Sequence, residues 1–104
     1  MKIAITSKGT ELTSEIDPRF GRCKYFIFID TETMEFECKE NPFIDADGGA
    51  GVQAGQLVVS ENPDLIITGD LGPKALGIVK ESGIEYITKV AGTIEEIVEK
   101  YKKK

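Results

Sequence analysis

The sequence predicts an α/β protein in which helices cover both faces of one mixed β-sheet. Its first half holds two strand-like segments joined by a tight turn, which is typical of antiparallel pairing. Its second half alternates short apolar strands with helical segments, and this order requires parallel strands joined by right-handed crossovers. The chain has 104 residues, of which 40% are hydrophobic. That length fits one domain, residues 1–104, with a single core.

Three strands are expected in the first half. Lys2–Thr6 is a short β-branched run and predicts a buried strand. An irregular loop follows, and then Lys24–Asp30 predicts a strand because it is rich in aromatic residues and isoleucine. Thr33–Asn41 alternates polar and apolar residues, which indicates a strand with one solvated face paired to its predecessor. The apolar face of this third strand is expected to carry Met34, Phe36 and Cys38.

The second half predicts three helices and two strands. The expected elements are a helix at Gly51–Asn62, a strand at Asp64–Thr68, a helix at Gly72–Gly83, a strand at Ile84–Thr88 and a last helix that begins after Thr93. The middle helix has proline in its first turn and glycine at its end. Thr93 and Glu96 form a capping box for the last helix. In the first helix, the positions expected to be buried are Val52, Leu57, Val58 and Val59.

The charge balance and the apolar runs exclude several classes of protein. The net charge is −5 and the chain has no histidine, which argues against bulk nucleic-acid binding, since that needs a basic face. No apolar run is long enough for a signal peptide or a membrane helix. We therefore expect a soluble cytoplasmic protein with neither nucleic acid nor membrane as its partner. A small anion held in a local basic pocket remains compatible with this composition.

The first segment that contains candidate functional residues is a basic loop. Arg19, Arg22 and Lys24 place three positive charges around Cys23. Positive neighbours favour the thiolate, so Cys23 is the better candidate of the two cysteines for a metal ligand or a reactive thiol. Two alternatives remain: Cys23 is an ordinary buried thiol, or one of the arginines simply pairs with Asp17 across the turn.

The second segment is the glycine-rich stretch from Asp45 to Gly55. Gly49–Ala54 matches the G-x-G-x-x-A form of a dinucleotide fingerprint, but no strand directly precedes it and no P-loop lysine follows. The alternative is a glycine-rich entry into a helix at a sharp turn. In both cases, unblocked N–H groups at the helix start form a concavity that favours anions.

The third segment, Thr68–Ala75, is a turn from strand to helix. The helix is expected to begin at Gly72 and Pro73, on the same edge of the sheet as the glycine-rich stretch. Asp70 is unexpected in an anion site, and it is expected either to cap this helix or to pair with Lys74. Because the two helix starts share this edge of the sheet, we expect both helix N-termini and the basic loop to converge on one crevice.

The two cysteines, Cys23 and Cys38, are expected to be reduced. If the hairpin turn centres on residues 31–33, Cys38 lies opposite Phe26 or Ile27, and Cys23 is then about 10 Å further along the strand. A disulfide needs Cα atoms within about 7 Å. For Cys38 the favoured interpretation is a small buried hydrophobic side chain rather than a ligand.

Taken together, the three segments resemble a known family. DPRFGR, GGAGVQAGQL and TGDLGPKA, in this order and spacing, are similar to the dinitrogenase iron–molybdenum cofactor biosynthesis family. That family includes small nitrogenase accessory proteins and orange proteins with a molybdenum–copper cluster. The resemblance extends over nearly the whole chain. It implies a ribonuclease H-like three-layer α/β/α fold and a non-enzymatic role as carrier or scaffold for an anionic metal–sulfur cluster.

The resemblance also implies a set of cofactor-binding residues. They are Arg19, Phe20, Gly21 and Arg22 in the basic motif, with Cys23 beside them as the candidate metal ligand; Gly48, Gly49, Ala50, Gly51 and Gln53 in the glycine loop; and Gly69 and Gly72, followed by Pro73, in the strand-to-helix turn. Many relatives have histidine where this chain has Gly48. Two cysteines per chain cannot form a four-thiolate iron–sulfur site. Either two chains supply the thiolates, or charge and shape hold a molybdenum- or iron-containing sulfur cluster.

Other functions remain open at this point. The same crevice could bind a phosphorylated small molecule. The chain could instead bind a protein partner, for example a cluster-assembly protein, with a vestigial crevice, and it could be a monomer or a homodimer. A nuclease of this fold would need a cluster of carboxylates for two metals, and Lys2–Thr6 offers none.

Overall fold

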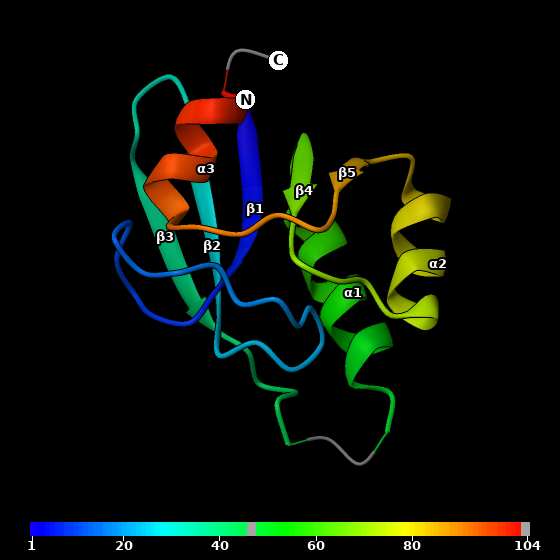
Figure 1. The fold of residues 1–104 in the computed structure, drawn as a ribbon. Helices are drawn as coiled ribbons and strands as arrows, with labels where there is room; N and C mark the ends of the chain where they lie inside the picture. Colours follow the sequence, from blue (N-terminus) through cyan, green and yellow to red (C-terminus); the bar gives the residue numbers. More distant parts are fainter. Residues whose placement is uncertain (46–47, 103–104) are drawn as a thin grey trace.

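The computed structural model describes residues 1–45 and 48–102, and there it contains the predicted elements in the predicted order (Figure 1). The elements are β1 (Lys2–Ser7), β2 (Tyr25–Asp30), β3 (Phe36–Glu40), α1 (Ala50–Ser60), β4 (Leu65–Ile67), α2 (Pro73–Ser82), β5 (Glu85–Ile87) and α3 (Ile94–Tyr101). The predicted capping box is present, since Thr93 and Glu96 bond to each other's backbone N–H. Residues 46–47 of the glycine-rich stretch lie outside the described residues.

The strands form one mixed sheet in the order β3-β2-β1-β4-β5. β1 pairs antiparallel with β2, and β2 pairs antiparallel with β3. β4 lies parallel to both β1 and β5. Because β1, β4 and β5 run in one direction, their carboxyl ends meet at one edge of the sheet, where ligands bind in open α/β folds. The predicted change from antiparallel to parallel pairing is confirmed.

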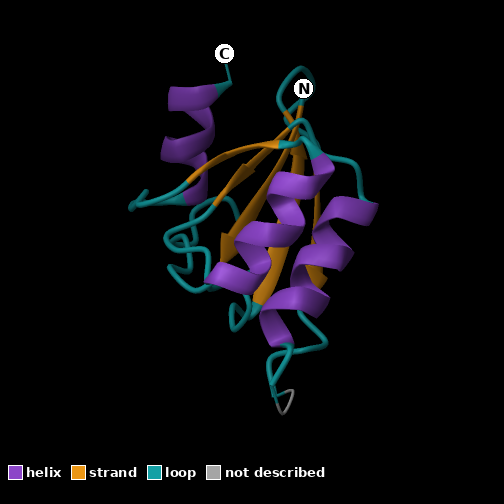
Figure 2. Ribbon diagram, turned by 90° about the vertical axis from the view of Figure 1, so that its right-hand side faces the viewer, coloured by secondary structure: helices purple, strands orange, loops and turns teal. Residues whose placement is uncertain are grey.

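Helices cover both faces of this sheet, which makes three α/β/α layers with the predicted ribonuclease H-like arrangement. Figure 2 shows α1 and α2 in front of the strands and α3 on the far side. One core cluster joins Phe26 and Phe28 of β2 to Val58 of α1 and Val79 of α2. A second cluster lies on the opposite face and includes Ile97 of α3.

The buried face of α1 differs from the prediction. Val58 is buried as expected, but Val52, Leu57 and Val59 are only partly covered. The other buried residues of the helix are small, namely Ala50, Ala54 and Gly55. The reason is the closeness of α2, because a Cβ at Gly55 would lie 3.2 Å from Ile78.

The third strand agrees with its prediction in part. Cys38 lies opposite Ile27, as the turn position predicted, and both cysteines are free. Met34 and Cys38 pack against the core, but the side chain of Phe36 is 38% exposed. β3 is an edge strand, so Phe36 has a neighbouring strand on one side only and remains partly exposed.

A cavity between two helix N-termini

The candidate site is a cavity of about 350 Å³ where α1 and α2 begin. Both helices begin at their lower ends in Figure 1. Its lining comes from all three predicted segments. The lining residues are Gly21, Arg22, Gly49, Ala50, Gly51, Gly72, Pro73, Lys74 and Ala75. The prediction that the basic loop and two helix starts converge on one opening agrees with this lining.

The start of α1 presents backbone N–H groups without a side-chain cap. Its N-cap residue is Gly49, whose φ of 70° is the left-handed conformation that glycine adopts most easily. The first intrahelical bond runs from the N–H of Gln53 to the carbonyl of Gly49. The N–H groups of Ala50, Gly51 and Val52 therefore have no partner within the helix.

The start of α2 has the same character. Its N-cap residue is Gly72, which again has no side chain to cap the helix, and Pro73 at the first helical position has no N–H. The first intrahelical bond runs from Leu76 N–H to the Gly72 carbonyl, so the N–H groups of Lys74 and Ala75 point beyond the helix. Neither role expected for Asp70 is present in the described residues, because it does not cap α2 and forms no ion pair with Lys74.

Small residues bring the three segments together. A Cβ at Gly21 would lie 3.0 Å from both the backbone nitrogen and the Cα of Gly51, so the basic loop touches the start of α1 backbone to backbone. A Cβ at Gly51 would in turn lie 3.6 Å from the Cβ of Ala75, at ordinary contact distance. The two helix N-termini and the basic loop can share one cavity because these positions carry little or no side chain.

Among the described residues, two cationic side chains line the cavity, Arg22 and Lys74. Arg22 Nη1 donates a hydrogen bond of 2.6 Å to the carbonyl of Ile44, which leaves the other guanidinium N–H groups for a ligand. Lys74 is exposed and lies in the first turn of α2. The partial positive charge of a helix N-terminus adds to both cations. The cavity is therefore suited to an anion.

Arg19, by contrast, is not part of the cavity lining. Its Nε and Nη2 atoms each lie 3.3 Å from a carboxylate oxygen of Asp17, whose side chain is only 1% exposed. The Asp17 carboxylate raises the pKa of the Arg19 guanidinium through this hydrogen bond and through its charge. The structure thus contains the alternative in which one arginine pairs with Asp17. Arg19 stabilises the basic loop through this ion pair.

Cys23 lies in the apolar core and not, as expected, in a positively charged environment. Its side chain is fully buried in the core cluster under α1 and α2. Burial raises the pKa of the Cys23 thiol well above its usual range, and the charge of Asp17 adds to this, while Arg19 opposes it only weakly. The prediction that positive neighbours favour the thiolate is wrong, because the loss of hydration outweighs them. As placed, the thiol does not line the cavity.

The remaining predicted residues support the site or lie beside it. Phe20 is buried and packs against Phe26, with ring centroids 5.8 Å apart. Gly48 and Gln53 are exposed and do not line the cavity. A Cβ at Gly69 would lie 2.5 Å from the Cα of Pro18, so this glycine allows the basic loop to cross the end of β4.

Asn41 is a residue of the site region that the sequence did not single out. It is buried at the end of β3, and its side-chain nitrogen donates to the carbonyls of Gly21 (3.0 Å) and Cys23 (2.9 Å). Its side-chain oxygen accepts from the N–H of Phe43. Asn41 thus fixes both sides of the loop that carries Arg22. An Asn-Pro pair at the end of a strand is typical of a turn. The sequence therefore did not indicate that the Asn41 side chain also bonds to the basic loop.

Direct metal ligation has little support in the described residues. In residues 1–45 and 48–102, no three His, Cys, Asp or Glu side chains gather in a way that could hold a metal ion. None of the described helices is both long and apolar enough to cross a membrane. The fold and the site together define a small α/β/α domain with an opening that, among the described residues, is lined by the starts of two helices and by the side chains of Arg22 and Lys74.

The chain belongs to the family described as dinitrogenase iron-molybdenum cofactor, whose model matches residues 1–104. It is 30% identical over 101 residues to an uncharacterized protein of Methanocaldococcus jannaschii, covering 94% of this chain and 82% of the relative. Its structure is similar to the apo form of the orange protein from Desulfovibrio gigas, with a TM-score of 0.92, 32% identity, and 98% and 87% of the two chains covered. A putative NifB protein from Thermotoga gives a TM-score of 0.82 with the same identity and coverage.

Proposed function

We propose that this protein is a non-enzymatic carrier or scaffold that binds an anionic metal–sulfur cluster, or a molybdenum–sulfur precursor of one, in the cavity between α1 and α2. One observation carries the proposal: two helix N-termini with glycine at both N-caps open into a single cavity that Arg22 and Lys74 also line. The cargo would be taken up in the cytoplasm and passed to cluster-assembly proteins. Family membership supports the choice of a metal–sulfur anion over other anions.

Charge and shape would hold the cargo, not thiolate ligation. Unpaired amide N–H groups donate hydrogen bonds to sulfide or oxo groups, and charge-assisted bonds from arginine strengthen them. Gly49, Gly51 and Gly72 leave room for a bulky anion to approach the backbone. The absence of histidine from the sequence rules out an imidazole ligand from this chain. The burial of Cys23 argues for the same non-covalent mode.

The direct experiment is titration of the purified protein with tetrathiomolybdate and a copper salt under anaerobic conditions. Binding should change the visible absorption spectrum and raise the melting temperature. A ligand at about 100 times its Kd stabilises the folded state by about 2.7 kcal/mol. For a domain of this size that corresponds to a rise of roughly 10–20 °C.

Arg22→Glu and Lys74→Glu test the site itself, because both reverse a charge at the cavity. Each should abolish most of the spectral change and most of the thermal shift. Lys24→Glu is the matched control, since Lys24 is exposed, lies two residues from Arg22 and does not line the cavity. It should bind like the natural protein. Equal losses in all three variants would mean that net charge, and not this cavity, attracts the anion.

Uncapped helix N-termini also bind phosphate groups, so nucleotides and sugar phosphates belong in the same thermal-shift screen. A shift with these compounds and none with the molybdenum–sulfur anion would replace the carrier proposal with a phosphorylated ligand. The proposal would be contradicted if neither the phosphorylated compounds nor the molybdenum–sulfur anion raised the melting temperature of the natural protein or of the variants. The cavity would then have no anionic cargo.

A further inference from the structure

The open edge of β3 exposes backbone hydrogen-bonding groups in a regular order. The bonds from Asp30 N–H to the Glu35 carbonyl and from Asn41 N–H to the Lys24 carbonyl show that the odd-numbered residues of this strand face β2. In antiparallel pairing the next residues along the strand face the other way. The N–H and C=O groups of Phe36, Cys38 and Glu40 therefore point away from the sheet. Within the described residues, none of these groups has a partner in the chain.

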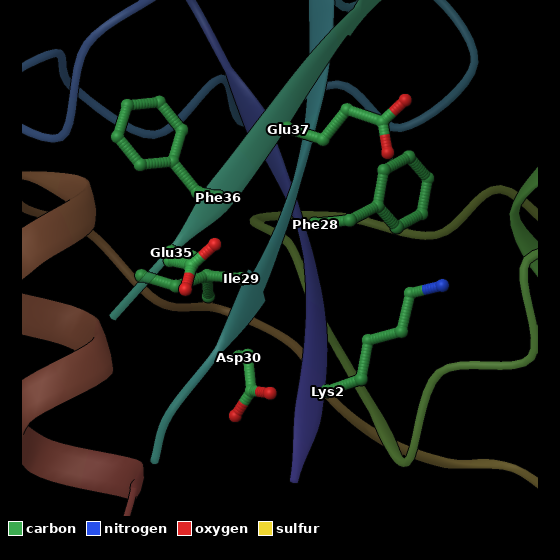
Figure 3. Close-up of a pocket in the computed structure, with 7 residues that line it drawn as sticks. All are labelled: Lys2, Phe28, Ile29, Asp30, Glu35, Phe36 and Glu37. Atoms are coloured by element: carbon green, nitrogen blue, oxygen red, sulfur yellow. The ribbon is translucent and has the colours of Figure 1, made fainter. Parts of the chain in front are cut away.

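The side chains of β3 carry two opposite charges on one face. Glu37 and Lys39 are two residues apart, with Lys39 Nζ 3.7 Å from Glu37 Oε1. Figure 3 shows Glu37 projecting to the same side of the sheet as Phe28, and Phe36 projecting to the other side. Among the described residues, Phe36 is the one large hydrophobic side chain classed as exposed. An edge strand offers its unpaired N–H and C=O groups to another strand, and charges such as these oppose pairing unless the partner strand carries complementary charges opposite them.

We propose that β3 pairs antiparallel with β3 of a second copy of this chain, so that two sheets join across a two-fold axis. The axis passes beside Cys38, which lies opposite Cys38 of the second copy. The outward groups of Phe36 then bond with those of Glu40 in the other chain. On the charged face, Glu37 lies opposite Lys39 of the second copy, and this pair occurs twice by symmetry.

Charge complementarity selects this register among those available. Moving one chain by two residues would place Glu37 opposite Glu37, or Lys39 opposite Lys39, and directly opposed like charges are destabilising. Moving it by one residue would match outward backbone groups with inward ones and would exchange the two faces. The proposed register is also the one that pairs all five residues of Phe36–Glu40. The strand therefore specifies its own copy as its partner.

The experiment is analytical ultracentrifugation of charge variants. The natural protein should dimerise in a concentration-dependent manner. Lys39→Glu and Glu37→Lys each replace two attractive pairs with two repulsive ones, so each should weaken the dimer by about tenfold or more. The double variant E37K/K39E restores opposite charges across the axis and should return the association constant to near that of the natural protein.

These variants distinguish pairing of the two β3 strands from the effect of net charge on association and from the effect of losing a contact within the chain. Glu37→Lys changes the net charge from −5 to −3, and weaker overall repulsion would favour association, whereas the proposal requires it to weaken. Lys39→Glu also breaks the 2.7 Å contact between Lys39 and Glu61, but so does the double variant, so that loss cannot explain a difference between them. Glu81→Lys, an exposed change of the same charge on α2, is the control and should dimerise normally.

A short thiol-reactive cross-linker provides a second readout, because Cys38 should lie close to its copy. Cross-linked dimers should form in the natural protein and should be absent in Cys38→Ser. A natural protein that stays monomeric at every concentration would overturn the proposal. So would a double variant that associates no better than its single parents.

Discussion

Gly21 touches Gly51 backbone to backbone, and this contact places the basic loop at the start of α1. A Cβ at Gly21 would lie 3.0 Å from the backbone nitrogen and the Cα of Gly51, with the carbonyl carbon of Ala50 at 3.3 Å. Backbone atoms at a helix start cannot move aside as the end of a flexible side chain can. The position of Arg22 at the cavity therefore depends on a residue without a side chain immediately before it.

Gly21→Ala should separate the loop from α1. The added methyl group overpacks the contact, and such changes typically cost about 1–3 kcal/mol of folding free energy. The affinity for an anionic cargo should fall as well, because Arg22 would be displaced from the helix start. Urea unfolding and ligand titration measure the two effects.

Gly72→Ala is the matched control for this prediction. Gly72 also lines the cavity, but a Cβ there would meet nothing within 4 Å, and its φ of −62° suits any residue. Its folding free energy should change by less than that of Gly21→Ala. If both alanine variants were equally stable, the Gly21–Gly51 contact would not be the constraint that positions the loop.

The sequence predicted the elements, their order and the change in strand direction, because each depends on local patterns such as the proline and glycine at the ends of α2. It also predicted that three distant segments meet at one edge. It could not distinguish Arg19 from Arg22, since that depends on Asp17 being buried beside one of them. Cys23 was misjudged for a similar reason: neighbouring charges can be read from the sequence, but desolvation depends on the packing of α1 and α2.

Asn41→Ala should loosen the same loop from the side of β3. The change would leave the carbonyls of Gly21 and Cys23 without the donor that now lies 3.0 Å and 2.9 Å from them. Buried polar groups that lose their partner cost about 1–3 kcal/mol each. We expect a lower unfolding free energy together with weaker cargo binding, measured by urea titration and by visible absorption. Loss of stability with unchanged binding would mean that Asn41 supports the fold but not the position of Arg22.

The ion pair between Lys39 and Glu61 should make stability depend on pH in the acid range. The hydrogen bond from Lys39 lowers the pKa of Glu61 in the folded protein below its ordinary value of 4.5, and the charges of Lys39 and Lys2 add to this. A carboxylate with a lowered folded-state pKa contributes its full stability above the unfolded-state pKa. That contribution is lost as the pH falls from about 4.5 through the folded-state value.

Glu61→Gln isolates this effect. The difference in unfolding free energy between the natural protein and the variant should be constant above pH 4.5 and should shrink as the pH is lowered further. Urea unfolding at a series of pH values measures it. Other acidic groups, such as Glu96 with its lowered pKa, are common to both proteins and cancel in the difference. A difference that stays constant into strong acid would mean that Glu61 gains nothing from its lysine partners.

The two cysteines should differ sharply in reactivity, which bears on how a cargo is held. Cys23 is fully buried and its thiol pKa is strongly raised by burial, whereas Cys38 is only partly buried on an edge strand. In the native protein, iodoacetamide should therefore modify Cys38 first, and Cys23 only after unfolding, as peptide mass spectrometry would record. Cys38→Ser should be unreactive until denatured and should bind an anionic cargo like the natural protein. Equal labelling of both thiols in the native state would require the loop around Cys23 to open readily, and a thiolate ligand at the cavity would then become tenable.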